Sequence, residues 1–341
     1  MSEDRKDTTN EGVERASLKR TRRSFLVAAA GIAGGYGFYR WIDRAAEDQL
    51  LPKPLRAALN FNERVSRGVF AERGLTPTYP VERSVDLRIN GNFGLKQDLL
   101  PESWRLQVVG VDQPKRFAQY VDDVTTWEYK YAAGLATYAG HETKVAPKAE
   151  QGNASAPETK MTPEFEKAFA EMRAAQGKKP LRGQEEAGKS DSTLDPGTAG
   201  LLLTIVDIAM LPKQELVTQF KCIEGWSEIV HWGGVPLRDF IAAYPPAKNA
   251  GGELPKYVYM ETPNGDYYCG FELRECEHPQ SLLVTEMAGR PLTEAHGAPL
   301  RLHMPIKYGY KQIKRIGLIA YTDTKPDDYW TKLGYDWYAG L

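Results

Sequence analysis

Cysteine is scarce in this sequence, and so is net charge. The chain of 341 residues has three cysteines and contains no Cys-x-x-Cys, Cys-x-x-Cys-His or His-Glu-x-x-His pattern. The usual zinc sites and covalently attached haem are therefore excluded. With 44 basic and 45 acidic residues the net charge is -1, so no global field draws the protein to nucleic acid.

Aromatic residues, by contrast, are plentiful. The chain has 18 tyrosines and 7 tryptophans, and it is long enough for one large domain or two ordinary ones. This composition predicts a globular protein with a walled pocket for a compact substrate or a buried cofactor, because aromatic side chains bury large apolar areas.

Residues 1–45 have the pattern of an export signal. A polar leader ends in KRTRRSFL at residues 19–26, and sixteen uncharged residues run from Ser24 to Tyr39. This resembles a twin-arginine signal, which exports folded proteins to the periplasm. As a helix the uncharged run spans roughly 24 Å, less than the ~30 Å core of a bilayer. Ala45-Ala46 is the best cleavage candidate; an uncleaved membrane anchor and an ordinary N-terminal helix are the alternatives.

The twin-arginine pattern favours a redox enzyme, since such proteins fold around a cofactor before export. In an oxidising compartment the odd number of cysteines leaves at least one thiol unpaired. Cys269 and Cys276, seven residues apart, can pair across a bend, which would make Cys222 the spare thiol. Three unpaired cysteines without a role are the alternative.

The catalytic domain is expected over residues 46–341. A helix is predicted around Leu55–Val69 and a strand at Trp104–Val111. Residues 140–199 are rich in Ala, Lys, Glu, Gly and Pro, which predicts a polar, largely flexible insertion with one short helix at 162–177. An interdomain linker is the alternative.

After the insertion, strand-like apolar runs alternate with turns. The runs begin LLLTIVDIAML, ELVTQFKCIEGW, KYVYMETPNGDYYCGFEL and SLLVTEMAGRPL, and turns are expected at Gly233–Pro236, Pro263–Asp266 and Gly289–Pro291. The predicted fold class is therefore α+β, mixed and rich in strands.

Two stretches carry groups suited to chemistry. Cys222 lies two residues before Glu224, and a carboxylate raises the pKa of a thiol. A metal would remove that obstacle, whereas a thiol–imidazole pair, for example with His231, has no local signature. Residues 288–316 concentrate positive charge, and this suits a phosphate group or a solvated basic face; the basic side chains are Arg301, Lys307, Lys311 and Lys314.

Four motifs in a fixed order resemble one known family. KCIEGW, the following W-x-G-V-P-L, HPQSLLVTEMAGRPL and HGAPLRLHMPIKYGYKQIK are similar to the molybdopterin-binding domain of the sulfite oxidase superfamily, especially the exported bacterial branch that includes methionine sulfoxide reductase catalytic subunits. The resemblance runs from about residue 85 to the C-terminus outside the insertion. It implies a sulfite-oxidase-like fold without the C-terminal immunoglobulin-like dimerisation domain.

The resemblance also implies a cofactor, Mo-molybdopterin, and a set of residues. Cys222 would be the metal ligand and Glu224 a catalytic group that relays protons to the departing oxygen atom. Asn90 or Asn92, in RINGN, would contact the cofactor. The remaining cofactor-binding residues would be Thr262, His296, Arg301, Gln312, Ile313 and Lys314. Related enzymes often have Asn at the position of His296.

The residues after Cys222 bear on the direction of the reaction. Sulfite oxidases carry arginines there, whereas this chain has Ile223, Glu224, Gly225 and Trp226. An acidic and aromatic wall repels sulfite and accepts a neutral sulfoxide or N-oxide. Trp226 or Trp232 would pack on the substrate, or either would simply fill the core.

The resulting expectation is an exported molybdopterin oxidoreductase that reduces a small or protein-bound sulfoxide. Its electrons would come from a separate partner, such as a membrane haem protein, and it would be a monomer. Sulfite oxidation and a non-catalytic periplasmic binding module are the alternatives.

Overall fold

The computed structural model describes residues 34–48, 50–69, 74–132, 187–190 and 194–341. The chain forms two units, Met1–Phe61 and Asn62–Leu341. The predicted twin-arginine motif and the predicted helix at 162–177 lie outside the described residues.

The first unit contains a helix over residues 34–43 and a short antiparallel pair. Strand β1 (Glu47–Asp48) pairs with β2 (Leu51–Pro52), and helix α2 (Lys53–Val69) then begins. The prediction of a helix at Leu55–Val69 is confirmed. In the described ranges, no helix combines the length and the apolar character needed to cross a bilayer.

The second unit is a mixture of strands and short helices, which confirms the predicted α+β class. Its strands are β3 (Leu106–Val109), β4 (Tyr120–Val121), β5 (Gly200–Leu203), β6 (Gln214–Lys221), β7 (Ser227–Pro236), β8 (Tyr257–Glu261), β9 (Tyr268–Glu272), β10 (Leu282–Met287), β11 (Arg290–Pro291), β12 (Arg301–His303) and β13 (Leu318–Thr322). Its α-helices are α4 (Ile205–Ala209), α5 (Leu237–Ala243), α6 (Leu273–Cys276) and α7 (Tyr329–Lys332). Its 3-10 turns are η1 (Val81–Arg83), η2 (Pro101–Ser103), η3 (Pro114–Arg116), η4 (Val124–Thr126), η5 (Glu294–His296) and η6 (Gly309–Lys311).

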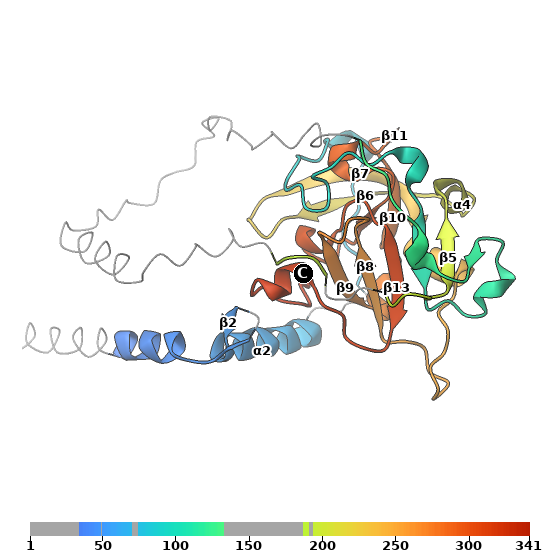
Figure 1. Cartoon of the computed structure of the whole chain (residues 1–341). Helices are drawn as coiled ribbons and strands as arrows, with labels where there is room; N and C mark the ends of the chain where they lie inside the picture. The colour runs from blue at the N-terminus through green and yellow to red at the C-terminus, as the bar shows by residue number, and fades with distance from the viewer. Residues whose placement is uncertain (1–33, 49, 70–73, 133–186, 191–193) are drawn as a thin grey trace, which may run out of the picture. The chain divides into compact units, whose positions relative to one another are not determined.

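Two sheets organise these elements (Figure 1). The larger has the order β4-β5-β3-β13-β8-β9, and β3 and β13 are its parallel pair. The smaller runs β11-β10-β7-β6, with β12 also pairing with β10. Strand β3 buries Leu106 and Val108 on one face, as its alternating pattern predicted.

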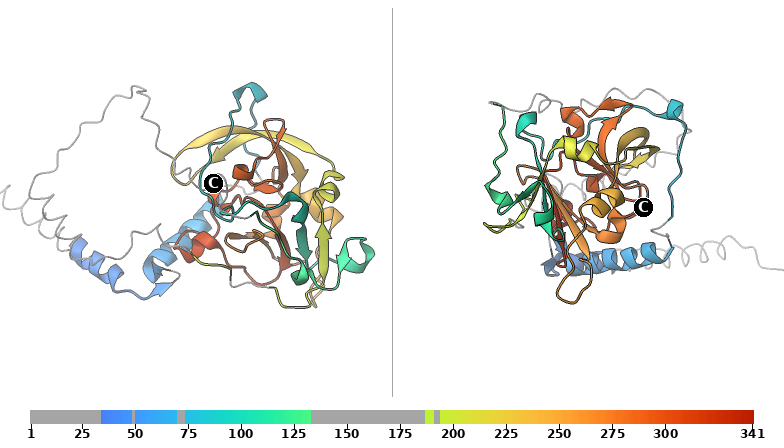
Figure 2. Two further views of the ribbon diagram at one scale, coloured as in Figure 1. Left: turned by 45° about the horizontal axis from the view of Figure 1, so that its top comes forward. Right: turned by 90° about the vertical axis from the view of Figure 1, so that its right-hand side faces the viewer.

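The long β6–β7 hairpin carries the cysteine motif. Its register runs from Gln214 opposite Gly234 to Lys221 opposite Ser227, so residues 222–226 form the connecting loop. Figure 2 shows the two strands curving together across one side of the second unit. The hairpin therefore presents Cys222 at the end of a paired strand, where the backbone is fixed.

Two local predictions were wrong. The stretch Gly233–Pro236 is the end of β7 and not a turn. Strand β10 approaches β7 so closely that a Cβ on Gly234 would lie 2.2 Å from the carbonyl oxygen of Leu283, and only glycine allows this packing. The run LLLTIVDIAML is not one strand, because Thr204 and Asp207 form a capping box that begins α4.

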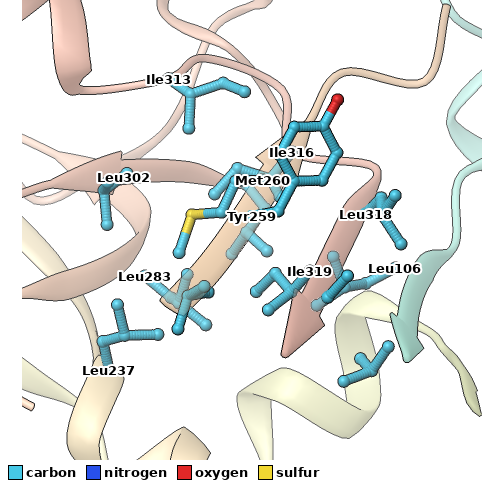
Figure 3. Close-up of a cluster of buried hydrophobic side chains, with 14 of the residues drawn as sticks. Leu106, Leu237, Tyr259, Met260, Leu283, Leu302, Ile313, Ile316, Leu318 and Ile319 are labelled. Atoms are coloured by element: carbon cyan, nitrogen blue, oxygen red, sulfur yellow. The ribbon is translucent and has the colours of Figure 1, made fainter. Parts of the chain in front are cut away.

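The main core lies between the two sheets. Figure 3 shows Leu106, Met260 and Ile319 from the larger sheet near Leu283 and Leu302 from the smaller one. A second cluster of buried residues covers the smaller sheet and includes Cys222, Phe220 and Trp232. The cysteine motif thus belongs to a packed layer even though it lies in a loop.

Candidate functional site

One cavity of about 330 Å³ brings together distant segments of the second unit. Its walls come from the segment around residues 87–93, the β6–β7 loop, β12 and the region 309–335. The lining residues are Leu87, Arg88, Asn90, Gly91, Phe93, Phe220, Cys222, Ile223, Glu224, Trp226, Tyr267, Arg301, Gly309, Tyr310, Gln312, Lys314, Trp330 and Tyr335. Six of the predicted site residues are on this list: Asn90, Cys222, Glu224, Arg301, Gln312 and Lys314.

Cys222 begins the β6–β7 loop and is buried. Its N–H donates to the Trp226 carbonyl at 2.9 Å, and the N–H of Gly225 donates to the Cys222 carbonyl at 3.1 Å. Gly225 has φ +90, a conformation that glycine adopts without strain. The loop geometry therefore fixes the position of the thiol.

The Cys222 thiol has no base that would activate it. Burial raises its pKa, the Glu224 carboxylate adds to that effect, and a hydrogen bond from Asn90 opposes it. No histidine is among the residues that the structure places around the cavity. His231 instead lies 3.2 Å from Glu215. A cysteine nucleophile is therefore poorly supported, whereas a metal would hold the sulfur as a thiolate.

Glu224 lies at the edge of the cavity beside the cysteine. Trp226 Nε1 donates to Glu224 Oε2 at 2.9 Å, and Asn90 Nδ2 donates to the same oxygen at 3.4 Å. Asn90 Nδ2 also lies 3.6 Å from Cys222 Sγ. The carboxylate is thus exposed to solvent but held in place, as a proton-relaying group requires.

Asn90 and Asn92 were alternatives in the sequence, and the structure distinguishes them. The Asn90 side chain reaches Cys222 and Glu224. Asn92 is not among the cavity-lining residues, and its carbonyl accepts from the N–H of Leu95 at 2.9 Å. Of the two, Asn90 is the one at the cavity.

Arg301 is a buried cation without an acidic partner. Only 1% of the residue is exposed, and no carboxylate of the described residues pairs with it. Its guanidinium lies 4.9 Å from the centre of the Trp232 ring, and its Nε has no hydrogen-bond partner. Burial lowers its pKa to about 9. A buried charge left in this state is costly, and an anion in the cavity would relieve the cost.

Lys314 supplies a second cation at the same cavity. Its Nζ donates to the carbonyls of Asn90 and Gly91 at 3.0 and 3.1 Å, which ties the 87–93 segment to the C-terminal region. Burial, together with the charge of Arg301, lowers its pKa to about 7. An anion would raise that pKa and complete the coordination of the amine.

Three predicted residues lie behind the cavity rather than at its surface. Thr262 bonds within its own turn, with Oγ1 donating to Asn264 Oδ1 at 2.8 Å. Ile313 is fully buried in the main core. His296 is buried and does not line the cavity, although its carbonyl accepts from Arg301 Nη1 at 3.3 Å and its Nδ1 has no partner. Burial, followed by the charges of Arg301 and Lys314, lowers the pKa of His296 to about 4.

Gln312 lines the cavity but uses its side chain within the protein. Its Oε1 accepts from His303 Nδ1 at 2.8 Å, and its Nε2 donates to the carbonyls of Lys307 at 3.1 Å and Met304 at 3.3 Å. It therefore braces the loop that precedes η6. Its backbone N–H also bonds within the protein, to the Gly309 carbonyl at 3.0 Å.

The predicted basic cluster of the C-terminal region is only half correct. Lys307 Nζ donates to Glu275 Oε1 at 2.5 Å, and Lys311 Nζ donates to Asp328 Oδ2 at 2.5 Å. Both pairs are fully buried. These two lysines were expected near a phosphate, but local acids already satisfy them. Arg301 and Lys314 alone remain from that cluster.

Sequence reasoning missed most of the aromatic wall. Phe93, Tyr267, Trp330 and Tyr335 all line the cavity. Trp330 Nε1 donates to Tyr267 Oη at 2.9 Å, and the Trp330 and Tyr335 rings lie 4.9 Å apart. The abundance of aromatics near the C-terminus was the available signal, but their meeting with Phe93 depends on tertiary contacts.

Sequence reasoning also missed Arg88, which bears on the argument that an acidic and aromatic wall around Cys222 repels sulfite. Its guanidinium stacks 4.5 Å from the Trp226 ring and pairs with Glu228 at 3.0 Å. The fold has therefore brought a distant arginine to the cavity, already neutralised by an acid. Of the two tryptophans weighed as substrate contacts, Trp226 lines the cavity, whereas Trp232 is fully buried against His303 and Arg301.

The other two cysteines do not form the proposed disulfide. Cys269, Cys276 and Cys222 are all free, and the first two are fully buried away from the cavity. Within the described ranges there is also no group of three or more His, Cys, Asp or Glu side chains that could hold a metal. Among the described residues that line this cavity, Cys222 is the one sulfur donor.

These residues fit a molybdenum–pterin group. A lone buried thiol is suited to a metal whose other ligands come from a cofactor, and two unpaired cations are suited to the phosphate of that cofactor. The unpartnered Nε of Arg301 provides a further polar atom at this cavity. The cavity thus offers a sulfur donor and anion-binding groups together.

Comparison with known proteins agrees with this chemistry. Residues 197–330 match the oxidoreductase molybdopterin binding domain. A putative protein-methionine-sulfoxide reductase subunit of Azospira oryzae is 36% identical over 138 residues, 40% of this chain and 50% of the relative. The catalytic subunit MsrP of Xanthomonas axonopodis is 34% identical over 148 residues, 40% of this chain and 45% of the relative. The Campylobacter jejuni MsrP is 33% identical over 160 residues, 41% and 52% of the two chains.

The chain spans about half the length of the curated relatives it matches. Among solved structures, the sulfane dehydrogenase SoxCD of Paracoccus pantotrophus is similar with a TM-score of 0.33 and 20% identity, covering 37% of this chain and 36% of that one. The family match includes Cys222, Glu224, Thr262, Arg301 and Lys314. Residues 197–330 are therefore similar to an oxidoreductase molybdopterin binding domain, and this similarity includes the cysteine loop and the two unpaired cations.

Proposed function

We propose that this protein is a molybdopterin-dependent oxidoreductase that removes an oxygen atom from a sulfoxide, such as methionine sulfoxide, or from an N-oxide. The observation that carries the proposal is the meeting of Cys222 with Arg301 and Lys314 around one cavity. The relatives named as methionine-sulfoxide reductases support the choice of substrate.

A bound molybdenum–pterin group would supply two-electron oxygen-atom transfer. Cys222 would hold the metal through sulfur, and Arg301 and Lys314 would bind the anionic part of the cofactor. Glu224 would deliver protons to the oxygen atom that leaves. The overall reaction consumes two electrons and two protons and yields a sulfide and water.

The wall around Cys222 favours a neutral substrate. Ile223 is 46% exposed, an unusual state for a large apolar side chain at a cavity. Trp226 and Phe220 stack 5.8 Å apart on the same side. These surfaces would pack on the apolar arms of a sulfoxide.

Sulfite oxidation is the second candidate, and Arg88 is the observation in its favour. A dianion needs cations near the metal, and Arg88 lines the cavity beside Trp226. Its pairing with Glu228 makes it a weaker anion ligand than an unpaired arginine, because the carboxylate already accepts from its Nε at 3.0 Å. Sulfoxide reduction is therefore preferred.

The proposal extends to the partner and the compartment. The twin-arginine pattern supports export of the folded protein to the periplasm, where its leader stays attached or is removed. Electrons would come from a separate protein, such as a membrane haem protein. The word subunit in the names of the relatives supports a partner of this kind. The protein itself would be a monomer.

The deciding experiment compares Cys222→Ala with Cys276→Ala in the full chain made in a cofactor-competent host. We expect Cys222→Ala to lose at least about a thousandfold in sulfoxide-dependent oxidation of a reduced dye and to change the molybdenum paramagnetic resonance signal, because a metal ligand is lost. Cys276→Ala is the control, since Cys276 is also buried, at 0% exposed against 9% for Cys222, but does not line the cavity.

Three results would count against the proposal. An unchanged metal signal in Cys222→Ala would remove the ligand assignment. Turnover with sulfite and an oxidised dye alone would establish the opposite reaction. Protein purified without molybdenum and with no turnover would favour a binding module that retains the domain.

A further inference from the structure

The helix over residues 34–43 exposes an unusual set of large aromatic side chains. Tyr36 is 63% exposed, Phe38 60% and Trp41 58%, and we call these three residues the aromatic band. The rings of Phe38 and Trp41 lie 5.8 Å apart. Phe38 and Trp41 are three residues apart and share one side of the helix, whereas Tyr36 lies on another side. Three exposed aromatic side chains within six residues are a local concentration of apolar surface, and such concentrations mark interaction surfaces.

Two arginines accompany the aromatic band. Arg40 and Arg44 are four residues apart, so they lie on the same side of the helical turn. Together with Gly37, Trp41 and Ala45 they border a cavity of about 440 Å³ in the first unit. Arg40 has a weak partner in Asp43 at 3.9 Å, and the described residues give Arg44 no carboxylate partner. The surface therefore combines aromatic rings with positive charge.

The sequence around this helix indicates which kind of partner its exposed aromatic side chains bind. Tyr36 and Phe38 of the aromatic band fall at the end of the uncharged run Ser24–Tyr39, and Trp41 follows Arg40, the first charged residue after the run. Tyrosine and tryptophan at the end of an apolar segment, followed by arginine, are typical of the interface between lipid tails and headgroups.

We propose that the helix over residues 34–43 binds the surface of a bilayer that contains anionic phospholipid. The aromatic band lies at the boundary between headgroups and acyl chains, and Arg40 and Arg44 contact lipid phosphates. The inference requires that the leader remain attached, but it does not depend on the proposed chemistry. It would hold the enzyme at the membrane, where a membrane-bound electron donor is located.

The test uses the purified full chain and vesicles of phosphatidylcholine with or without phosphatidylglycerol. In flotation assays we expect Tyr36→Ser/Phe38→Ser/Trp41→Ser to bind vesicles at least about tenfold more weakly than the natural chain. Phe61→Ser is the matched control, because Phe61 is an equally exposed aromatic, at 63%, in α2. It should bind like the natural chain.

Arg40→Gln/Arg44→Gln separates charge from apolar contact. We expect this variant to lose about tenfold or more in binding to phosphatidylglycerol vesicles and little in binding to pure phosphatidylcholine. Fluorescence quenching by brominated lipids then measures how deeply Trp41 enters the bilayer. Because the chain has 7 tryptophans, the signal of Trp41 is taken as the difference between the natural chain and Trp41→Phe. Quenching at the headgroup boundary supports the proposal.

Two outcomes would overturn it. One is vesicle binding that is the same for the natural chain and the triple serine variant, which would show that the aromatic band makes no lipid contact. The other is a dimer in lipid-free solution that dissociates in the triple variant, which would make a second copy of the chain the true partner. Molybdenum content serves as a folding check, since these substitutions lie outside the second unit.

Discussion

The lysines and arginines of segment 301–314 fall into two groups with opposite environments. Lys307 and Lys311 each contact a buried carboxylate, from Glu275 and Asp328 respectively. Arg301 and Lys314 line the cavity and have no such partner among the described residues. The difference shows that a cation's role is set by whether the fold brings an acid to it. Lys307 and Lys311 use their charges within the protein, in buried ion pairs. Arg301 and Lys314 keep theirs available for a ligand in the cavity.

The sharpest way to break this comparison is to remove a paired lysine. Lys311→Met leaves Asp328 buried without its cation, so we expect the free energy of unfolding to fall by about 3–5 kcal/mol in urea denaturation. Asp328→Asn added to Lys311→Met should recover part of the loss, because the orphaned charge disappears. A loss below about 1 kcal/mol in the single variant would mean that the pair is not structural.

Removing an unpaired cation should change the free energy of unfolding little and weaken cofactor binding. For Arg301→Met we expect an apoprotein whose free energy of unfolding changes by less than about 1 kcal/mol, because no acid is left without a partner. Retention of molybdopterin, measured as molybdenum and pterin per protein after dialysis, should weaken roughly 10- to 100-fold through loss of charged hydrogen bonds. Full retention of the cofactor would place the anion site elsewhere.

His303 extends the comparison to a histidine. It is buried beside Arg301 and has no carboxylate partner among the described residues. Burial lowers its pKa to about 3, with Thr218 and Gln312 bonded to its two ring nitrogens. The unfolded chain takes up a proton near pH 6.5 and the folded state does not, so stability is lost as the pH falls through that value.

When the pH falls from 7 to 5, protonation of His303 in the unfolded chain should lower the free energy of unfolding of the natural protein by about 2 kcal/mol. His303→Gln removes that contribution, and urea denaturation at the two pH values measures the difference between the two proteins. Equal losses in both would show that His303 is protonated in the folded state.

Much of the site was predictable because its motifs are local. The loop of residues 222–226 closes through its own hydrogen bonds and Gly225, so the position of Cys222 relative to Glu224 follows from a short stretch of chain. The β8–β9 hairpin was equally predictable, since short apolar runs flank the turn that ends at Asp266. Local propensity and tertiary structure agree in these places.

Predictions failed where a distant contact decided the outcome. Gly234 belongs to a strand because β10 approaches it, although Gly-Gly-Val-Pro reads locally as a turn. Lys307 and Lys311 were assigned to an anion site because their acids lie far away in sequence, at Glu275 and Asp328. Spacing alone allowed Cys269 and Cys276 either to pair or to stay free, and they lie buried in β9 and α6 as free thiols.

The sequence by itself determined the α+β class, the family motifs, the Cys222 thiol near a carboxylate and the aromatic residues beside Arg40 at the end of the uncharged run Ser24–Tyr39. Only the tertiary structure decided which cations face the cavity, that Asn90 rather than Asn92 reaches the thiol, and that Phe93 meets Trp330 at 5.3 Å. The physical reason is that chain periodicity specifies which face of an element is apolar, whereas charge pairing and cavity walls depend on residues that meet only when the two sheets pack together.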